Sequence, residues 1–523
     1  MSDVVKRLEL STEIVKSWGQ SRLPNGKSLT EQLTFDGLSL WDVMAPVMAL
    51  FYVPAALSCQ KPATFAQRLR PHVGLAKQRA LNLIKRVPNM RGFDAASWPQ
   101  SEAFLFIGFS GYMYRDVLRP VAECLAQKKR REGVVLHDEL HFRNAPISMH
   151  LVRSQSIWGY WDGEVENEAR ALNKQLLAAI VELRALEAFP LLIQAAGKSL
   201  WPQMQNSFNW LFNFHLPLLV PQVAIARHIL KRHRPALIIS ADVADARARV
   251  YSLLGRQLNI PSLEIQFGPN GAEGVEWQFL LADRVATWGE TTRKALLEHG
   301  VQTEQISITG SPRHDSLVNV DANDVAKTRV RLGIPAGHAM VLCASTYQQK
   351  EYNSLSDPEL LVSMKRAVFK AAGQVSGLCL VVKPHPIENV QETRRLIGAG
   401  CNILLVDPAE DIRELTKACD AFIGFGSTAT VDAMIADKLT ICPAFPGWIW
   451  SEMFVKSNAV LEPSSEEEVL SSLRSIVDGS IHKVKAELEP ARLSFLQKWT
   501  YKIDGNSSER TAMLAMEMAA DSQ

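Results

Sequence analysis

Residues 380–436 decide the fold, reading LVVKPHPIE at 380–388, then a helix and a strand, then DAFIGFGSTATVDAMIA at 420–436. Each of two apolar strands runs into a polar turn, Lys383–Pro386 after the first and Gly424–Thr428 after the second. In an open parallel sheet such turns lie side by side at the carboxyl ends of the strands, where ligands bind. The second turn also begins a helix, whose backbone N–H groups favour an anion. The two turns therefore predict a phosphate site for a nucleotide.

Strands and helices alternate on both sides of this stretch. EAFLFIGFS at 102–110 and PALIISADVAD at 235–245 belong to a first series, and AMVLCAST at 339–346 starts a second. Strands joined by helical crossovers form parallel sheets. We therefore predict an α/β protein with two Rossmann-like, doubly wound sheets facing a central cleft. The expected segments are a helical region at 1–100, sheet domains at 101–310 and 311–490, and a last helix at 491–523 that packs back on the first domain.

Size and composition fit a soluble protein of several domains. The chain has 523 residues, 47% hydrophobic and 21% charged, and a net charge of +2, which gives no reason to expect a nucleic-acid partner. Seven cysteines without C-x-x-C spacing suit a reducing compartment. No signal peptide is apparent, and the apolar run Val43–Cys59 contains Pro46 and Pro54 and is too short to span a bilayer. We expect a cytoplasmic protein.

The helical region at 1–100 contains a hairpin turn at Asp36-Gly37 and a basic segment. Residues 61–91 hold eight Lys or Arg and no acidic residue, with apolar side chains interspersed. Such an amphipathic segment could lie on an anionic membrane surface. A solvated helix face or the rim of an acceptor site is the alternative.

The order of the motifs resembles the GT-B glycosyltransferases that build bacterial surface polysaccharides. This group includes capsule-type transferases, bacterial sialyltransferases and CDP-glycerol glycerophosphotransferases. The resemblance covers about 35–60 and 100–515, and rests on FDGLSLW, RPALIISADVADARARV, ISITGSPRHDSL, KPHP, GFGSTATVDAMIADK and DGNSSERTA. It implies a metal-independent transferase without a cofactor, with an acceptor domain at 101–310 and a nucleotide-donor domain at 311–490.

The resemblance also implies donor-binding residues. In relatives that use cytidine nucleotides, a His-Pro pair and a Ser-Thr pair hold the nucleotide and its phosphate, and His385-Pro386 and Ser427-Thr428, after Gly426, stand at those positions. His385 would donate a hydrogen bond and, if protonated, offset the leaving charge. Capping of turns and helices is the alternative for these residues.

Other candidates for donor contact are less specific. Lys383 either adds charge or is a solvated strand end. Arg313 either binds a phosphate or carboxylate or forms an ion pair between the domains. Ser345 and Thr346 follow the first strand of the second domain and would face donor phosphate or base.

Transfer to a hydroxyl needs a carboxylate base from the first domain. Glu273 lies in a turn where many sialyltransferases show an acidic pair before Gly, but Ala272 replaces the first acid. Asp242 matches an acidic position of the polysaccharide-transferase pattern, or it caps the helix that begins near Ala244. Phe267 replaces the His of a Gln-His-Gly turn found in relatives.

We therefore predict a glycosyltransferase at the cytoplasmic face of the inner membrane, with no metal site. The preferred donor is CMP-linked Kdo or another nonulosonic acid, and the acceptor is a surface polysaccharide or glycolipid. The alternatives are a CDP-glycerol-type polyol phosphotransferase, a nucleotide-sugar 2-epimerase on the same fold, and a catalytically silent partner of an assembly complex.

Overall fold

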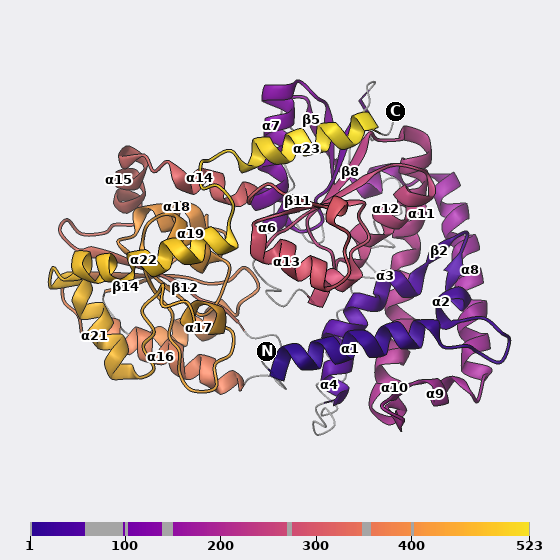
Figure 1. Ribbon diagram of the computed structural model, residues 1–523, viewed down its shortest axis with the longest axis horizontal. Coiled ribbons are helices and arrows are strands. Elements are labelled where there is room, and N and C mark those ends of the chain that lie inside the picture. Colours follow the sequence, from indigo (N-terminus) through magenta and orange to yellow (C-terminus); the bar gives the residue numbers. More distant parts are fainter. Residues whose placement is uncertain are drawn as a thin grey trace.

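The computed structural model describes residues 3–57, 98–99, 103–138, 150–268, 275–347, 357–398 and 402–521. Figure 1 shows two α/β units side by side, with the helices of the N-terminal region against the first unit. The basic segment at 61–91 lies outside the described residues.

The first unit is built on a seven-stranded parallel sheet with the order β11-β10-β9-β8-β3-β4-β5. Its strands are β3 (Phe104–Ile107), β4 (Gly133–His137), β5 (Val152–Ser156), β8 (Leu237–Ser240), β9 (Ser262–Ile265), β10 (Arg284–Thr287) and β11 (Ile306–Ile308). The central strands are short apolar runs buried on both faces, as expected for a parallel sheet covered by helices. The strand order reverses between β3 and β8, so a crevice forms at their carboxyl ends.

Helices cover both faces of this first sheet (Figure 1). They are α7 (Arg119–Lys129), α8 (Gly163–Ala185), α10 (Trp201–Trp210), α11 (Leu216–His233), α12 (Ala246–Gln257) and α13 (Glu290–Glu298). The last helix, α23 (Ser507–Asp521), returns to this unit and packs against α7, where Ala512, Ala515 and Met518 enter the core below the sheet.

The second unit is built on a five-stranded parallel sheet with the order β14-β13-β12-β15-β16. Its strands are β12 (Ala339–Ala344), β13 (Leu378–Lys383), β14 (Ile403–Leu405), β15 (Ala421–Gly424) and β16 (Leu439–Ile441). Its helices include α15 (Ala322–Arg331), α16 (Pro358–Gly373), α17 (Val390–Ile397), α18 (Ile412–Ala418), α19 (Ala429–Ile435), α21 (Glu466–Val477) and α22 (Ile481–Trp499). Here the order reverses between β12 and β15. The predicted pair of doubly wound sheets is confirmed.

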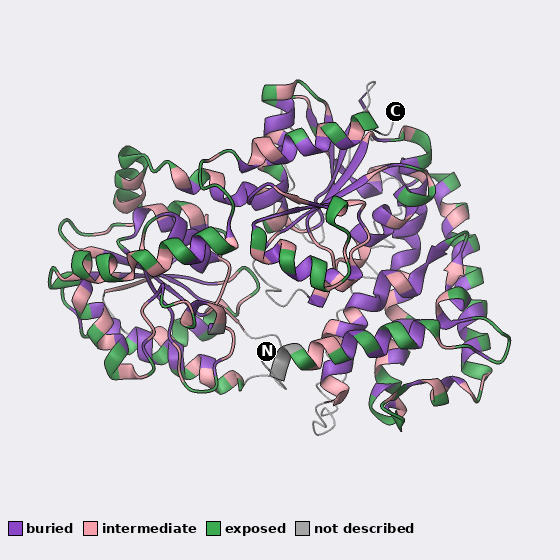
Figure 2. Cartoon of the chain, viewed as in Figure 1, coloured by how far each residue is buried: buried purple, intermediate pink, exposed green. Residues whose placement is uncertain are grey.

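The N-terminal region shares the core of the first unit. It comprises α1 (Asp3–Gln20), α2 (Leu29–Gln32), the hairpin β1 (Thr34–Phe35) and β2 (Leu38–Ser39), α3 (Leu40–Val47), η1 (Met48–Tyr52) and α4 (Val53–Leu57). Trp18 and Trp41 are 1% exposed and pack with Phe208 of α10. Figure 2 shows buried residues continuing from these helices into the first sheet. The hairpin turn lies at Asp36-Gly37, where it was predicted.

Three helices contain a wide π turn that ends two residues before a proline. The pairs are η1 and Pro54, η3 (Tyr114–Leu118) and Pro120, and η5 (Leu211–His215) and Pro217. A proline clashes with the carbonyl four residues earlier, and in each case that residue is the middle of the π turn. We infer that widening the turn relieves the clash and lets the helix continue.

The apolar helix from Leu40 to Leu57 continues through both Pro46 and Pro54, so the prediction that this run is too short to span a bilayer is wrong by length. By length and composition this 18-residue segment could cross a membrane, yet 56% of it is buried inside the protein, as in the core helix of a soluble domain.

Candidate functional site

A cavity of about 350 Å³ lies between the two units, at the points where the strand order of each sheet reverses. The first unit lines it with residues that follow β3 and β9, and the second unit with residues that follow β12, β13 and β15. The lining side chains include Tyr112, Arg115, Asp116, Phe267, Arg313, Ser345, Thr346, Tyr347, Lys383, His385, Pro386, Gly426, Ser427, Thr428, Trp448 and Trp450. All the predicted donor-binding residues therefore lie around one cavity.

The turn after β13 presents a neutral histidine. Burial and the nearby charge of Lys383 lower the pKa of His385 to about 4. His385 Nδ1 accepts a hydrogen bond from the backbone N–H of Ile387 at 3.4 Å, which leaves the proton on Nε2. The ring packs on Tyr347, with centroids 4.8 Å apart. His385 is thus a hydrogen-bond donor rather than the cation considered from the sequence.

Lys383 is a buried cation at the end of β13. Its ammonium donates to the carbonyls of Pro384 and Pro408 at 3.1 and 3.0 Å. Burial, together with the charge of Arg115, lowers the pKa of Lys383 to about 8. A bound phosphate would reverse that shift by supplying the opposite charge.

Glu388, which the sequence analysis did not single out, fixes the turn that carries His385. Its carboxylate accepts from the backbone N–H of His385 at 3.0 Å, from the ammonium of Lys365 at 2.6 Å, and from the hydroxyls of Ser345 and Thr393. An acid three residues after His385 in KPHPIE was the available signal. Because the Ser345 hydroxyl is occupied by Glu388, Ser345 contributes to the cavity wall more than to ligand binding.

The turn after β15 leaves two hydroxyl groups available. Ser427 Oγ is buried and has no hydrogen-bond partner among the described residues, and Thr428 does not use its hydroxyl to cap α19. Gly426 has φ +90°, and a Cβ there would lie 2.1 Å from the carbonyl oxygen of Trp450. Gly426 is therefore required for the loop that holds Trp448 and Trp450 to pack on this turn.

Aromatic side chains form another part of the wall. Trp448 donates from Nε1 to the carbonyl of Phe425 at 3.3 Å, and Trp450 and Tyr347 also line the cavity. Flat rings of this kind can stack with a nucleotide base. The two tryptophans in PGWIW, after β16, were not singled out from the sequence because their position beside the turn after β15 depends on the fold.

Arg313 forms the interdomain ion pair that the sequence left as an alternative. It is 4% exposed, and its Nε lies 2.9 Å from both carboxylate oxygens of Asp432. Nη1 donates to Asp116 of the first unit at 2.5 Å, and Nη2 also donates to Asp432. With these nitrogens occupied, Arg313 holds the units together at the base of the cavity.

Arg115 is a cation of the first unit that the sequence analysis missed. Its Nε donates to Asp116 at 2.8 Å, and its side chain remains 34% exposed at the cavity. Within the described ranges no other hydrogen bond of this guanidinium is found, and its charge also acts on the carboxylate of Asp411. Arg115 lies on η3, the π turn before Pro120, where no simple helical pattern predicts which side chains face the cavity.

The structure describes one of the two candidate bases, Asp242. Glu273 lies outside the described residues. Asp242 follows β8 and accepts from the backbone N–H groups of Ala244 and Asp245 at 3.1 Å, so it closes the turn before α12, whose N-cap is Asp245 and not Asp242 as the capping alternative had it. Burial and the neighbouring Asp245 raise the pKa of Asp242. Asp242 does not line the main cavity, but it lies near Tyr112, which does, and helps burial raise the pKa of that phenol to about 12.

A third carboxylate, Glu264 on β9, is 4% exposed, and burial raises its pKa to about 8. It accepts from the Ser240 hydroxyl, while its Oε1 has no partner among the described residues. The lone acid in the apolar strand SLEI was the available signal.

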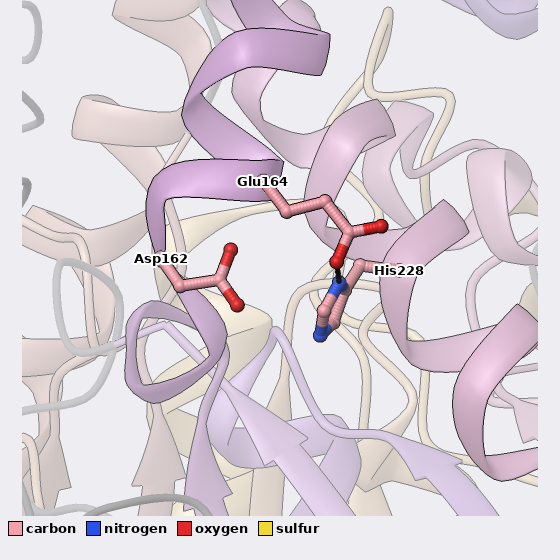
Figure 3. Close-up of side chains that lie close together, drawn as sticks. All are labelled: Asp162, Glu164 and His228. Atoms are coloured by element: carbon pink, nitrogen blue, oxygen red, sulfur yellow. Dashed lines mark ion pairs between the residues drawn. The ribbon is translucent and has the colours of Figure 1, made fainter.

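Figure 3 shows the one acid–histidine cluster with metal-ligand spacing in the described parts of the chain. Asp162 caps α8 by accepting from the N–H of Val165 at 2.9 Å, and Glu164 faces His228 at 3.9 Å. Both acids are exposed and none of the three lines the cavity. This cluster gives no reason to assign a metal to the site.

The sequence and the structure were compared with those of known proteins to find the class to which this protein is similar. Residues 289–442 match a family model described as CDP-Glycerol:Poly(glycerophosphate) glycerophosphotransferase. The wall teichoic acid polymerase TagF aligns with a TM-score of 0.52 at 12% identity, over 88% of this chain and 99% of that one. A putative UDP-N-acetylglucosamine 2-epimerase from Listeria monocytogenes aligns with a TM-score of 0.50 at 11% identity, over 81% and 98%. No curated protein sequence matches.

The structural similarity establishes the GT-B fold, and the family match covers α13 and β11 of the first unit together with the strands of the second unit and the polar turns after β12, β13 and β15. The protein is therefore a transferase with the GT-B fold. The resemblance to enzymes of surface polysaccharide synthesis, drawn first from the motifs, is confirmed.

Proposed function

We propose that the protein transfers a polyol phosphate from a CDP-linked donor to a surface polymer or glycolipid acceptor. One observation carries the proposal: the segment that matches the glycerophosphotransferase family, 289–442, contains the turns at Ser345, Lys383–Pro386 and Gly426–Thr428 around the cavity. The CMP-sugar donor preferred from the sequence is the second candidate, because the His-Pro and Ser-Thr pairs it rests on line the same cavity.

In the proposed reaction an acceptor hydroxyl oxygen attacks the phosphorus of the polyol phosphate. The bond from that phosphorus to the bridging oxygen of the diphosphate breaks, and CMP leaves with the electron pair. His385 Nε2–H, the hydroxyls of Ser427 and Thr428, and Arg115 would stabilise the charge on CMP. A carboxylate of the first unit would take the proton of the acceptor.

With a CMP-linked sugar the same groups would stabilise the same leaving CMP, but the acceptor would attack the anomeric carbon. Both candidates release CMP, so the nucleotide product alone does not separate them. Phosphorus in the acceptor product does, because only polyol phosphate transfer adds it.

The test is incubation with CDP-glycerol or CMP-Kdo and a glycolipid extract, followed by mass and phosphorus analysis of the acceptor. We expect phosphorus to be added from CDP-glycerol, and His385→Ala to slow this about 100-fold while His482→Ala, at an exposed histidine of α22, does not. Addition of Kdo without phosphorus would favour the second candidate. Epimerised nucleotide sugar formed without any acceptor would support the epimerase alternative instead.

We also propose that the protein works at the cytoplasmic face of the membrane, with residues 61–91 on anionic lipid. The eight basic residues of that segment support this proposal. Co-sedimentation with phosphatidylserine vesicles should be lost when these residues are changed to Gln, and binding that survives the change would refute it.

A further inference from the structure

A second cavity, of about 400 Å³, lies where the N-terminal helices meet the first unit. Its walls come from α1, α2, α3, α12 and the short helix η6 (Val275–Phe279). Its lining includes Lys16, Gly19, Thr30, Trp41, Asp42 and Gln278.

Arg249 of α12, only 4% exposed, holds these walls together. Its Nε and Nη2 donate to the backbone carbonyl of Asp42 at 3.2 and 2.8 Å. Its Nη1 donates to the carbonyls of Val243 at 2.9 Å and Phe279 at 2.5 Å. One buried guanidinium therefore links α3, η6 and the turn after β8, so this cavity is built into the fold.

Polar groups without partners converge on this cavity. Trp41 is 1% exposed, and its Nε1–H has no acceptor among the described residues. That edge of the indole faces Gly19 and Thr30, because a Cβ at Gly19 would lie 2.5 Å from Trp41 Nε1 and 2.9 Å from Thr30 Oγ1. The Thr30 hydroxyl likewise has no hydrogen bond within the described part of the chain. Trp41 is buried and Thr30 is partly exposed, and a ligand in the cavity would supply the partner that each of these two groups lacks.

Asp42 adds a carboxylate to the same wall. No Lys or Arg nitrogen of the described residues forms an ion pair with it, and the Lys16 ammonium at the mouth donates instead to Gln278 at 3.3 Å. Burial raises the pKa of this carboxylate, while the Ser39 side chain and the charge of Arg249 stabilise its charged form. A carboxylate accepts hydrogen bonds from the hydroxyl groups of a ligand and disfavours an anionic one. An indole N–H, a threonine hydroxyl, an amide and a carboxylate together suit a neutral ligand rich in hydroxyl groups.

The cavity is close to the proposed chemistry. Arg249 lies four residues after Asp245, the N-cap of α12, or about 6 Å along the helix. Asp245 in turn follows Asp242, the candidate base, and donates its backbone N–H to it. A polymeric acceptor that reaches Asp242 could therefore extend into this cavity.

We propose that this second cavity binds an uncharged sugar unit of the acceptor, beyond the unit that reacts. The inference rests on the proposed transfer to a glycan acceptor, and it assigns to the N-terminal helices a role in acceptor recognition. The cavity between the two units does not bind this sugar unit.

The test measures binding of the full-length protein to maltotriose and chitotriose, as neutral probes, by saturation-transfer NMR and calorimetry. We expect at least one to bind, and CDP not to displace it. Asp42→Asn should weaken binding about tenfold, the effect of one hydrogen bond to a charged group. Thr30→Val, which keeps the side-chain shape, should weaken it less. Asp162→Asn, at an exposed helix cap outside both cavities, should leave it unchanged.

CDP titration of the same samples separates the two proposals. If CDP binds and neither trisaccharide does, the inference fails and the proposed function stands. If a trisaccharide binds in a manner sensitive to Asp42→Asn and Thr30→Val while CDP does not bind, the proposed function fails instead. Trisaccharide binding that both variants leave intact would also overturn the inference, as would displacement of the sugar by glycerol 3-phosphate.

Discussion

The two units differ in how many of their candidate functional groups line the cavity between them. On the second unit, His385 and Ser427 line the cavity, and Ser427 Oγ has no hydrogen-bond partner among the described residues. On the first unit, the carboxylates of Asp242 and Glu264 are withdrawn from the cavity and have raised pKa values. The donor side therefore lines the cavity with hydrogen-bonding groups, whereas these two carboxylates of the acceptor side do not line it. Four experiments test this difference between the two sides of the cavity.

The largest effect is expected where the two sides are joined. Arg313→Ala leaves Asp432 buried without its cation and removes one of the cations beside Asp116, which keeps Arg115, so the free energy of unfolding should fall by about 3–5 kcal/mol. Denaturant unfolding measures this. Arg331→Ala, which removes a partly exposed pair with Glu410, should cost about 0–1 kcal/mol. Equal losses in both variants would show that the junction is not held by Arg313.

The next experiment compares kcat of a variant on the donor side with kcat of a variant on the acceptor side. His385→Ala should lower kcat about 100-fold, the usual effect of removing one donor to a developing anion. Asp242→Asn keeps the oxygen that accepts from Ala244 and Asp245, so it tests the base and spares the turn. If Asp242 is the base, kcat falls by a similar or larger factor with little change in Tm. An unchanged kcat would show that Asp242 is not the base and would leave Glu273 as the candidate. Measuring kcat of Glu273→Gln would then test Glu273.

Lys383 predicts how stability depends on pH. Its folded pKa is about 8 against an ordinary value of 10.5, so below pH 8 it is charged in both states and the burial penalty is fully present. Between pH 8 and 10.5 the unfolded chain binds more protons, and stability rises with pH. Relative to Lys383→Met, the free energy of unfolding of the wild type should rise by about 2–3 kcal/mol over this window. A flat difference between the two proteins would contradict the buried, shifted lysine.

The smallest effect concerns the cation that the first unit contributes to the donor side. Arg115→Gln should weaken CDP binding about tenfold, because one charge-assisted contact is lost, and cytidine binding much less. Calorimetry at two salt concentrations measures both. Arg119→Gln, which breaks an exposed pair with Glu123 on the following helix, is the matched control. An equal loss for cytidine and CDP would show that Arg115 does not meet phosphate.

The donor side could be predicted from the sequence because its turns are local. KPHP and GFGST each follow an apolar strand, and parallel pairing brings their ends together whatever the details of the fold. Arg115, Glu388 and the tryptophans at 448 and 450 could not be predicted in this way. Their positions depend on a π turn, on a hydrogen-bond network, and on a loop that crosses from the next strand. For Arg313 the sequence left two roles open, and only the positions of Asp116 and Asp432 distinguish them.

The π turn in η3 has a consequence for the thermodynamics of binding. It is associated with Pro120, a residue of the same helix, and so its shape requires no ligand. Arg115 therefore stands at the cavity, oriented through Asp116, before any nucleotide arrives. The entropy lost in ordering that guanidinium belongs to folding, and a donor that meets it should bind with a smaller entropic penalty than one that must order a free side chain.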